Sequence, residues 1–177
     1  MNMPFKEVVS VVNEKDKVVG RTTLAESHKN RQWHRIVHVL VFNNEGRLLL
    51  QKRGKSEALP LFWDASVGGH VEASETYVQA AVKECREELG LENFKLAPLF
   101  KFFHEGATAN HVCRVFSCIL SGSLNPHATE VEELRFASWS EIEGMRAKGE
   151  PFTQTFLKTL EKFAALQRIK LNLGKSE

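Results

Sequence analysis

The apolar residues of the chain fall into short runs that predict β-strands. EVVSVV and KVVGRTT flank the polar turn NEKD, which predicts a hairpin over residues 5–24. RIVHVLVF and RLLLQKR are separated by the strong turn sequence NNEG, so they predict a second, buried hairpin. Further strand candidates are FKLAPLFKFFHEG, HVCRVFSCILSG and LRFASW, while LAESHKNR suits a short helix or a loop.

Three later segments repeat their apolar residues at helical spacing. The first runs from Ser74 to Leu89, and Gly90 stands where a glycine that ends a helix belongs. SEIEGMRAKG predicts a helix capped by Ser140, and TQTFLKTLEKFAALQRIK predicts a C-terminal helix over about 153–170. Strands first, one central helix, more strands and then helices fit a single α/β domain over residues 1–177 with helices on both faces of a mixed sheet.

Composition and charge narrow the class of protein. A chain of 177 residues with 42% hydrophobic residues can close one core of its own. The net charge of +2 requires neither a nucleic-acid polymer nor a membrane as partner. The three cysteines show no CxxC spacing, which argues against a disulfide framework and a structural zinc site. With no signal peptide and no membrane-spanning run, we expect a cytoplasmic protein.

Three glutamates gather on the central predicted helix. Glu84, Glu87 and Glu88 stand at positions i, i+3 and i+4 and therefore share a face of the helix. Like charges at this spacing repel by roughly a few tenths of a kcal/mol per pair. A divalent cation with a preference for oxygen ligands, such as Mg²⁺, would remove this repulsion. The alternative is a solvated acidic face. The core is expected on another face of the helix, formed by Val78, Val82, Cys85 and Leu89.

The segment resembles the Nudix box, G-x5-E-x7-(R)-E-U-x-E-E-x-G-U, where U is a bulky aliphatic residue. The matching positions are Gly69, Glu75, Lys83, Glu84, Cys85, Glu87, Glu88, Gly90 and Leu91. Lys83 replaces an arginine that, in the family, ties the earlier box glutamate, here Glu75, to the helix. Lysine keeps the charge but loses the two-pronged hydrogen bonding of arginine. Cys85 replaces an aliphatic residue, which is a mild change.

The resemblance implies a fold, a cofactor and a reaction. The fold is the Nudix α/β/α sandwich around a mixed sheet. Mg²⁺, or alternatively Mn²⁺, would be held by Glu84, Glu87 and Glu88 beside Gly69. Water would attack the phosphoanhydride of a small diphosphate compound, with Glu84 and Glu87 as catalytic residues. The general base is a box glutamate or a glutamate of the later loop NPHATEVEELRF, where the candidates are Glu130 and Glu133.

Resemblance outside the box points to one branch of the family. VVNEKDKVVG, HRIVHVLVFNNEGRLLLQKR, LPLFWDASVGGHV and PFTQTFLKTL are similar to the branch that holds isopentenyl diphosphate isomerase and the YfcD-like bacterial Nudix hydrolases. The isomerase's catalytic cysteine and glutamate correspond to Gly68 and His111. Because isomerisation needs groups that move a proton, we expect hydrolysis instead. The isomerase and a non-catalytic diphosphate-binding module are the alternatives.

The same branch provides candidates around the substrate. Lys52, Arg53 and Lys55 follow a predicted strand and stand near basic positions of the isomerase, so they are expected to clamp a diphosphate, with His70 nearby. His28, His34 and His70 align with the isomerase's histidine-rich metal site. Whether they bind a second metal is left open, and His111 in place of an acidic ligand argues against a complete site.

The substrate itself is not determined by these patterns. The region beyond the box reads HEGATAN and carries neither the proline typical of ADP-ribose hydrolases nor the tyrosine typical of dinucleoside polyphosphate hydrolases. A nucleoside diphosphate derivative or another small diphosphate is therefore the expected substrate class, and a homodimer is one option for assembly.

Overall fold

Strand β3 (Trp33–Phe42) lies at the centre of the sheet in the computed structural model, which describes residues 7–173. Residues 5 and 6 of the predicted hairpin therefore lie outside the described part. β3 pairs along its whole length with a parallel neighbour, and antiparallel with two others and with the next strand of the chain, so the sheet is mixed. These neighbours and the strands beyond them are β8 (Asn110–Ile119), β7 (Ala97–Glu105), β6 (Val67–His70), β1 (Val8–Val12) and β2 (Val18–Thr23).

The strands of the second predicted hairpin separate soon after their turn. β4 (Leu48–Arg53) pairs with β3 at Phe42 and Leu48, beyond a turn closed by Gly46 at a φ of 74°. β6 then takes the place beside β3, while β4 pairs with β9 (Val131–Ala137) and β5 (Trp63–Asp64). The hairpin is thus formed at its turn, and its two strands lead into different parts of one nine-stranded sheet.

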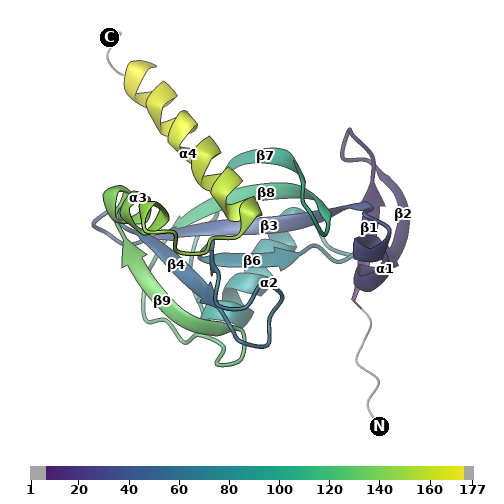
Figure 1. The fold of residues 1–177 in the computed structure, drawn as a ribbon, viewed down its shortest axis with the longest axis horizontal. Helices are drawn as coiled ribbons and strands as arrows, with labels where there is room; N and C mark the ends of the chain where they lie inside the picture. Colours follow the sequence, from purple (N-terminus) through teal and green to yellow (C-terminus); the bar gives the residue numbers. More distant parts are fainter. Residues whose placement is uncertain (1–6, 174–177) are drawn as a thin grey trace.

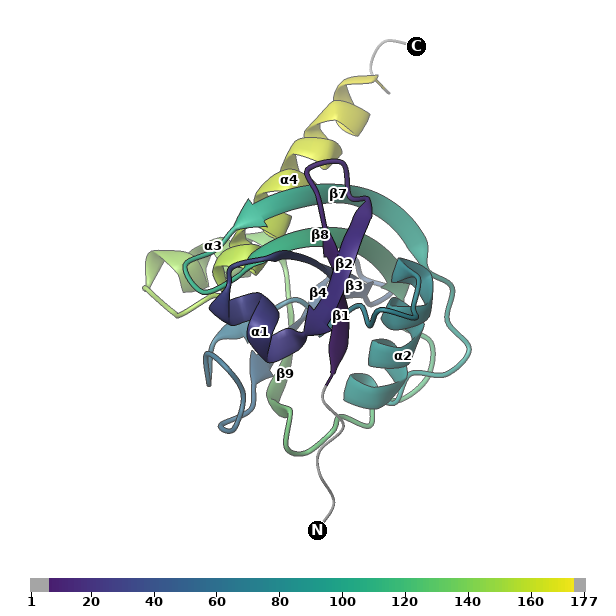
Figure 2. The ribbon, with the colours of Figure 1, turned by 90° about the vertical axis from the view of Figure 1, so that its right-hand side faces the viewer.

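Helices cover both faces of the sheet (Figures 1 and 2). α2 (Tyr77–Leu89) packs on the valines of β3 that point to one face, and α3 (Trp139–Ala147) and α4 (Gln154–Leu173) cover the other. The short helix α1 (Leu24–Lys29) lies beside the β1–β2 hairpin. The predicted α/β class, with helices on the two faces of a mixed sheet, is confirmed.

The orientation predicted for α2 is wrong in one respect. Val78 is 53% exposed, whereas Ala81, Cys85 and Leu89 form the core face together with Glu88, which is only 7% exposed. The prediction assumed that carboxylates turn away from the core, as they usually do. Here the acidic face and the apolar face overlap, so Val78 is left at the edge of the buried stripe in the first helical turn.

Two helices begin at residues other than those predicted, because a capping box fixes the first turn of each. Thr76 caps α2 through Gln79, two residues later than the predicted start at Ser74. Ser138 rather than Ser140 caps α3, because Glu141 at its third helical position completes the box. The three cysteines are buried and unpaired, as expected. Within residues 7–173, no helix is long and apolar enough to cross a membrane.

We expect Phe156→Ala to lower the free energy of unfolding by about 3–5 kcal/mol. Phe156 of α4 is fully buried and its ring stacks at 6.2 Å from that of Phe152, so truncation leaves a cavity under the sheet. Urea unfolding measures the change. Ile169→Ala, on the same helix but 57% exposed, is the matched control and should shift stability by less than about 0.5 kcal/mol. Equal losses in the two variants would contradict the described packing of α4.

Candidate active site

Glycine at position 69 lets α2 lie close to strand β6. A Cβ atom at Gly69 would overlap the carboxylate of Glu84, so only a residue without a side chain allows that glutamate to lie against the strand. α2 itself approaches the sheet with Ala80 and Ala81, both fully buried. The glycine turn and the helix of the predicted box therefore form one unit, in which Glu84 contacts the backbone that precedes the helix.

Two of the three clustered glutamates point inward. The carboxylate of Glu88 is buried and accepts a hydrogen bond from the side-chain amide of Gln51 on β4 (2.8 Å) and another from the backbone N–H of Gly68. The side chain of Glu84 is 14% exposed. Glu87 is the exposed member of the cluster. The cluster thus spans the boundary between core and solvent on α2.

Burial raises the pKa values of both inward glutamates. Desolvation, with the charge of Glu87 as an additional cause, raises the pKa of Glu84 to about 7. Desolvation and the charge of Glu84 raise the pKa of Glu88 well above its usual value. Two neighbouring carboxyl groups held in this state favour a bound cation, and their oxygens are the ligands that Mg²⁺ and Mn²⁺ prefer. The donor set therefore fits the predicted divalent metal.

Lys83 holds several of the acidic side chains together. Its ammonium lies 3.1 Å from Glu75, 2.9 Å from Glu72 and 3.7 Å from Glu84. Burial lowers the pKa of Lys83, but hydrogen bonds to Glu72 and Glu75 outweigh it and leave that pKa above its usual value. The lysine thus contacts Glu75, as the arginine of the motif would, and also Glu72, which the sequence analysis did not single out. Gly90, at a φ of 64°, ends the helix.

The basic residues at the end of β4, Lys52 and Arg53, and Lys55 just beyond it are engaged by carboxylates of the protein itself. Arg53 lies 3.3 Å from both Glu57 and Asp64 and also donates to the backbone carbonyl of Ala58. Lys52 lies 3.6 Å from Glu133, and the exposed Lys55 pairs with Glu132 at 3.0 Å. A diphosphate would have to compete with these carboxylates for each of the three cations.

Of the two glutamates proposed as bases, Glu133 lies on strand β9 rather than in a loop, and on the face of the sheet opposite the inward carboxylates. Gln51 points toward Glu88, so Lys52, the next residue of β4, points to the opposite face, where its ammonium lies over the ring of Trp63. Glu133 pairs with that lysine. Glu130 contacts His127 at 3.2 Å. The structure therefore brings together Gly69, Glu75, Lys83 and the box glutamates, but places Glu133 on the other face of the sheet.

Four histidines from four elements meet at one end of β3. The structure adds His111 of β8 to His28, His34 and His70, and one ring nitrogen from each lies within 4.8 Å of the others. Burial lowers the pKa of His34 to about 4, that of His70 to about 3 and that of His111 to about 2, and the neighbouring rings contribute. The imidazoles are thus neutral at pH 7. In the sequence analysis, His111 argued against a complete metal site because it replaces an acidic ligand. In the structure, His111 belongs to the histidine cluster.

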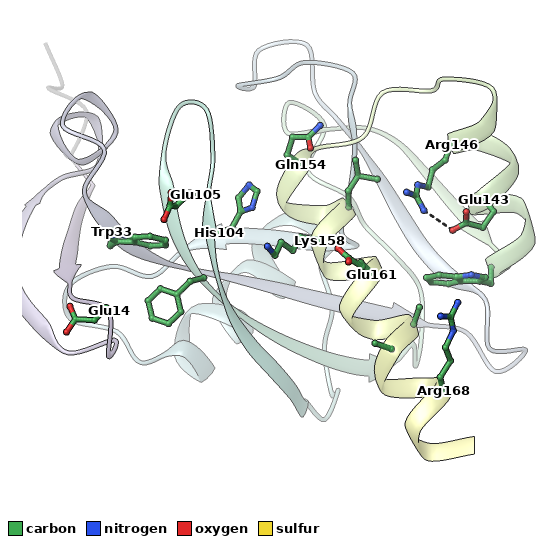
Figure 3. A pocket seen from close by; sticks show the side chains of 15 residues that line it. Glu14, Trp33, His104, Glu105, Glu143, Arg146, Gln154, Lys158, Glu161 and Arg168 are labelled. Atoms are coloured by element: carbon green, nitrogen blue, oxygen red, sulfur yellow. Dashed lines mark hydrogen bonds and ion pairs between the residues drawn. The ribbon is translucent and has the colours of Figure 1, made fainter. Parts of the chain in front are cut away.

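A groove of about 1220 Å³ lies elsewhere, between α3, α4 and the end of β7 (Figure 3). Its lining carries charges of both signs, including Lys158 and Glu161 of α4 and the ion pair between Glu143 and Arg146. None of the residues predicted to bind metal or substrate lines it. Because α4 and α2 cover opposite faces, this groove is separate from the glutamate cluster.

Comparisons with known proteins agree with the motif. The NUDIX domain family matches residues 32–160. The chain is 34% identical over 131 residues to the uncharacterised Nudix hydrolase PA4841 of Pseudomonas aeruginosa, which covers 73% of this chain and 78% of that protein. It is 30% identical over 155 residues to the Nudix hydrolase YfcD of Escherichia coli, 87% of this chain and 84% of that protein.

Solved structures show the same fold. DR0079 from Deinococcus radiodurans superposes with a TM-score of 0.79 at 25% identity, covering 88% of this chain and 98% of that one. More distant are the NUDIX domain of Shewanella oneidensis NrtR, complexed with ADP ribose (TM-score 0.61, 15% identity, 85% and 99% covered), and an Ap4A hydrolase of C. elegans (TM-score 0.56, 16% identity, 76% and 97% covered). These two share the fold.

Glu84→Gln should stabilise the protein in EDTA at pH 8. Because the folded-state pKa of Glu84 is raised from 4.5 to about 7, the folded protein binds the proton more tightly than the unfolded chain. The stability that this proton provides is complete below about pH 4.5 and is lost as the pH rises through about 7. The amide has no such loss, and we expect a gain on the order of 1–3 kcal/mol.

Chemical unfolding of both proteins in EDTA from pH 4 to pH 9 measures this difference. Glu92→Gln, a change at an exposed residue just beyond the helix, is the control and should follow the wild type. Parallel stability curves for Glu84→Gln and wild type across this range would show that Glu84 is not destabilised by its burial.

Proposed function

Because the chain belongs to the NUDIX domain family, we propose that it is a divalent-metal-dependent hydrolase that cleaves a phosphoanhydride bond in a small diphosphate compound. The observation that carries this proposal is the pair of inward carboxylates, Glu84 and Glu88, against the glycine turn at Gly69. A solvated acidic face, the alternative reading of the motif, would leave these side chains in water. Their burial favours a built ligand set.

The metal would be held by Glu84, Glu87 and Glu88, beside the backbone at Gly69. When bound, Mg²⁺ or Mn²⁺ would neutralise phosphoryl oxygens and lower the pKa of the attacking water. The chain itself orients the ligands: the Gln51 amide holds one oxygen of Glu88, and Lys83 restrains Glu84 from the side. This support fixes the carboxylates before any ligand arrives, so little reorganisation is needed on binding.

A box glutamate is the best candidate for accepting the proton of water. Glu87 is exposed at the edge of the cluster, where substrate and water reach it, and the raised pKa of Glu84 makes it a stronger base than an ordinary carboxylate. Glu130 and Glu133 rank lower, because their carboxylates are paired with His127 and Lys52. We therefore assign the catalytic role to Glu84 and Glu87.

The proposed reaction requires a substrate with a phosphoanhydride bond, and the names of similar proteins narrow this substrate class only broadly. NrtR was crystallised with ADP ribose and the C. elegans neighbour is an Ap4A hydrolase, so both proteins deal with nucleotides that contain a phosphoanhydride. Arg53, Lys52 and Lys55 remain the candidate diphosphate clamp, provided that substrate displaces their present partners. His70 follows Gly69 on β6 but points to the opposite face of the sheet, so it ranks below these three residues as a substrate contact. Isomerisation is less favoured, because Gly68 has no side chain to move a proton.

We expect Glu87→Gln to lower the rate of hydrolysis by at least about 100-fold without unfolding the protein, since it removes an exposed ligand and proton acceptor. A panel of ADP-ribose, Ap4A, nucleoside diphosphates and non-nucleoside diphosphates with Mg²⁺ or Mn²⁺ identifies the substrate through phosphate or nucleotide release. Glu92→Gln serves again as the exposed control and should keep full activity. A fully active Glu87→Gln would refute the metal assignment, and tight binding of a diphosphate without turnover in the wild type would instead establish a binding module.

Gly69→Ala should weaken Mn²⁺ binding by roughly 10–100-fold, the cost typical of disturbing a metal ligand's support. A methyl group there would overlap the carboxylate of Glu84 and push it away. The neighbouring Gly68→Ala is the matched control, because its methyl would lie 3.4 Å from the ring of His38, an ordinary contact. Titration calorimetry with Mn²⁺ compares the two variants. Equal affinities would argue that Glu84 does not bind the metal.

A further inference from the structure

We propose that His28, His34, His70 and His111 form a second metal site, which takes a borderline transition-metal ion of the Zn²⁺, Co²⁺ or Ni²⁺ class through four imidazole nitrogens. This inference does not rest on the proposed hydrolase function, because it concerns other residues and another class of metal. Two observations support the proposal: the positions of the four rings, and the hydrogen-bond partners of their nitrogen atoms within the protein.

The fold brings the four rings to one point from distant parts of the sequence. His34 of β3 and His111 of β8 are direct neighbours in the parallel pairing of these strands. His70 ends β6, which pairs antiparallel with β3 two residues further on. His28 approaches from α1 and its ring lies 5.0 Å from that of His34, centre to centre. Two central strands, a third strand and a helix thus each provide one ligand.

The spacing of the nitrogens suits tetrahedral coordination. The Nε2 atoms of His28 and His34 lie 3.3 Å apart. For a metal–nitrogen bond of about 2.0–2.1 Å, two ligands of a tetrahedral ion are separated by roughly 3.3–3.4 Å. The remaining separations, up to 4.8 Å, close with small rotations of the rings. Four histidines on an ion without a carboxylate also match the preference of Zn²⁺, Co²⁺ and Ni²⁺ for imidazole, whereas Mg²⁺ prefers oxygen.

The second nitrogens of two rings have the partners expected around a metal ligand. Nδ1 of His34 lies 3.0 Å from the backbone carbonyl of Gln32, so an N–H donated there leaves Nε2 free for a metal. Nδ1 of His70 faces the carboxylate of Glu7 at 3.6 Å. The hydrogen bond to Gln32 fixes the tautomer and orientation of His34, and the nearby carboxylate of Glu7 favours the N–H of His70 on Nδ1.

His111 provides the independent observation. Both of its ring nitrogens are buried and neither has a hydrogen-bond partner among the described residues. A buried polar group without a partner is rare in folded proteins and calls for a ligand or a specific role. The ring of His111 lies 4.8 Å from that of His34 and 6.4 Å from that of His70, centre to centre, so an ion among the four rings would provide the missing partner.

A metal here would join the periphery of the fold to its centre. α1 lies against β1 and β2 at the edge of the sheet, and His28 is the ligand that α1 contributes. The bound ion would link this helix to β3, β6 and β8 at once. We therefore expect the site to add thermal stability, as any ligand that binds the folded chain does.

The test is a Co²⁺ titration of full-length, chelator-treated protein carrying Glu84→Gln, which weakens the carboxylate site and leaves the histidines intact. We expect one Co²⁺ per chain with the intense visible absorption of four-coordinate cobalt, displaced by Zn²⁺. His28→Ala and His111→Ala, each added to Glu84→Gln, should weaken binding by more than the roughly 10–100-fold typical for losing an outer partner alone. His127→Ala, an exposed histidine outside the cluster, is the matched control and should change nothing.

The outcomes separate the proposal from its alternatives. Absence of the four-coordinate band in the variant with all four histidines overturns the site, and so does a band that survives both His28→Ala and His111→Ala. Circular dichroism checks folding, and His28→Ala, at a half-buried position, decides the question if His111→Ala does not fold. In crystals grown with Zn²⁺, an anomalous peak about 2.0–2.1 Å from the four imidazoles confirms it, and a peak at the glutamates alone contradicts it. Loss of hydrolysis in Glu87→Gln is independent of all these results.

Discussion

The inward orientation of two carboxylates on α2 is the constraint on which the rest of the site depends. Burying a charged group is costly unless it is paired or bound to a metal. The protein accepts this cost at Glu84 and Glu88 and offsets part of it with an amide from β4 and an ammonium from the helix itself. For these contacts to form, α2 must lie close to β6, which requires glycine at position 69 and small residues on the helix.

The close approach explains which features of the fold the sequence could predict. The apolar runs located seven of the nine strands but not the short β5 and β6, and the spacing of the box located the helix, its glutamates and the glycine at its end. The same reasoning failed at Val78, because it treated charge and burial as exclusive. In this helix the carboxylates share the buried face with Cys85 and Leu89. A local pattern shows that charges cluster, but whether the cluster faces the core depends on what the sheet presents opposite it.

The partners that came from other parts of the chain had weaker signals. Gln51 stands in the strand sequence RLLLQKR on the same face as Leu49, and this alternation could have marked it as an inward polar residue. Glu72 and Glu7 had no such signal. Glu72 meets Lys83 and Glu7 meets His70 only because the fold brings these separate segments of the chain together. His111 became a neighbour of His34 through a parallel pairing of β3 with β8, and no local pattern specifies such a pairing. The basic residues at the end of β4 were noted from the sequence, but their acidic partners were not.

Strand β6 shows how two different metal chemistries can stand one residue apart. Gly69 pairs with Val37, whose side chain belongs to the core under α2, whereas His70 pairs with Ile36, whose side chain belongs to the core under α4. Because side chains alternate across a strand, the residue next to the carboxylate cluster points to the opposite face, where the other histidines lie. Oxygen ligands on one face select hard cations and imidazoles on the other select softer ones. The sheet keeps the two proposed ligand sets apart, while the backbone of β6 holds them in a fixed relation.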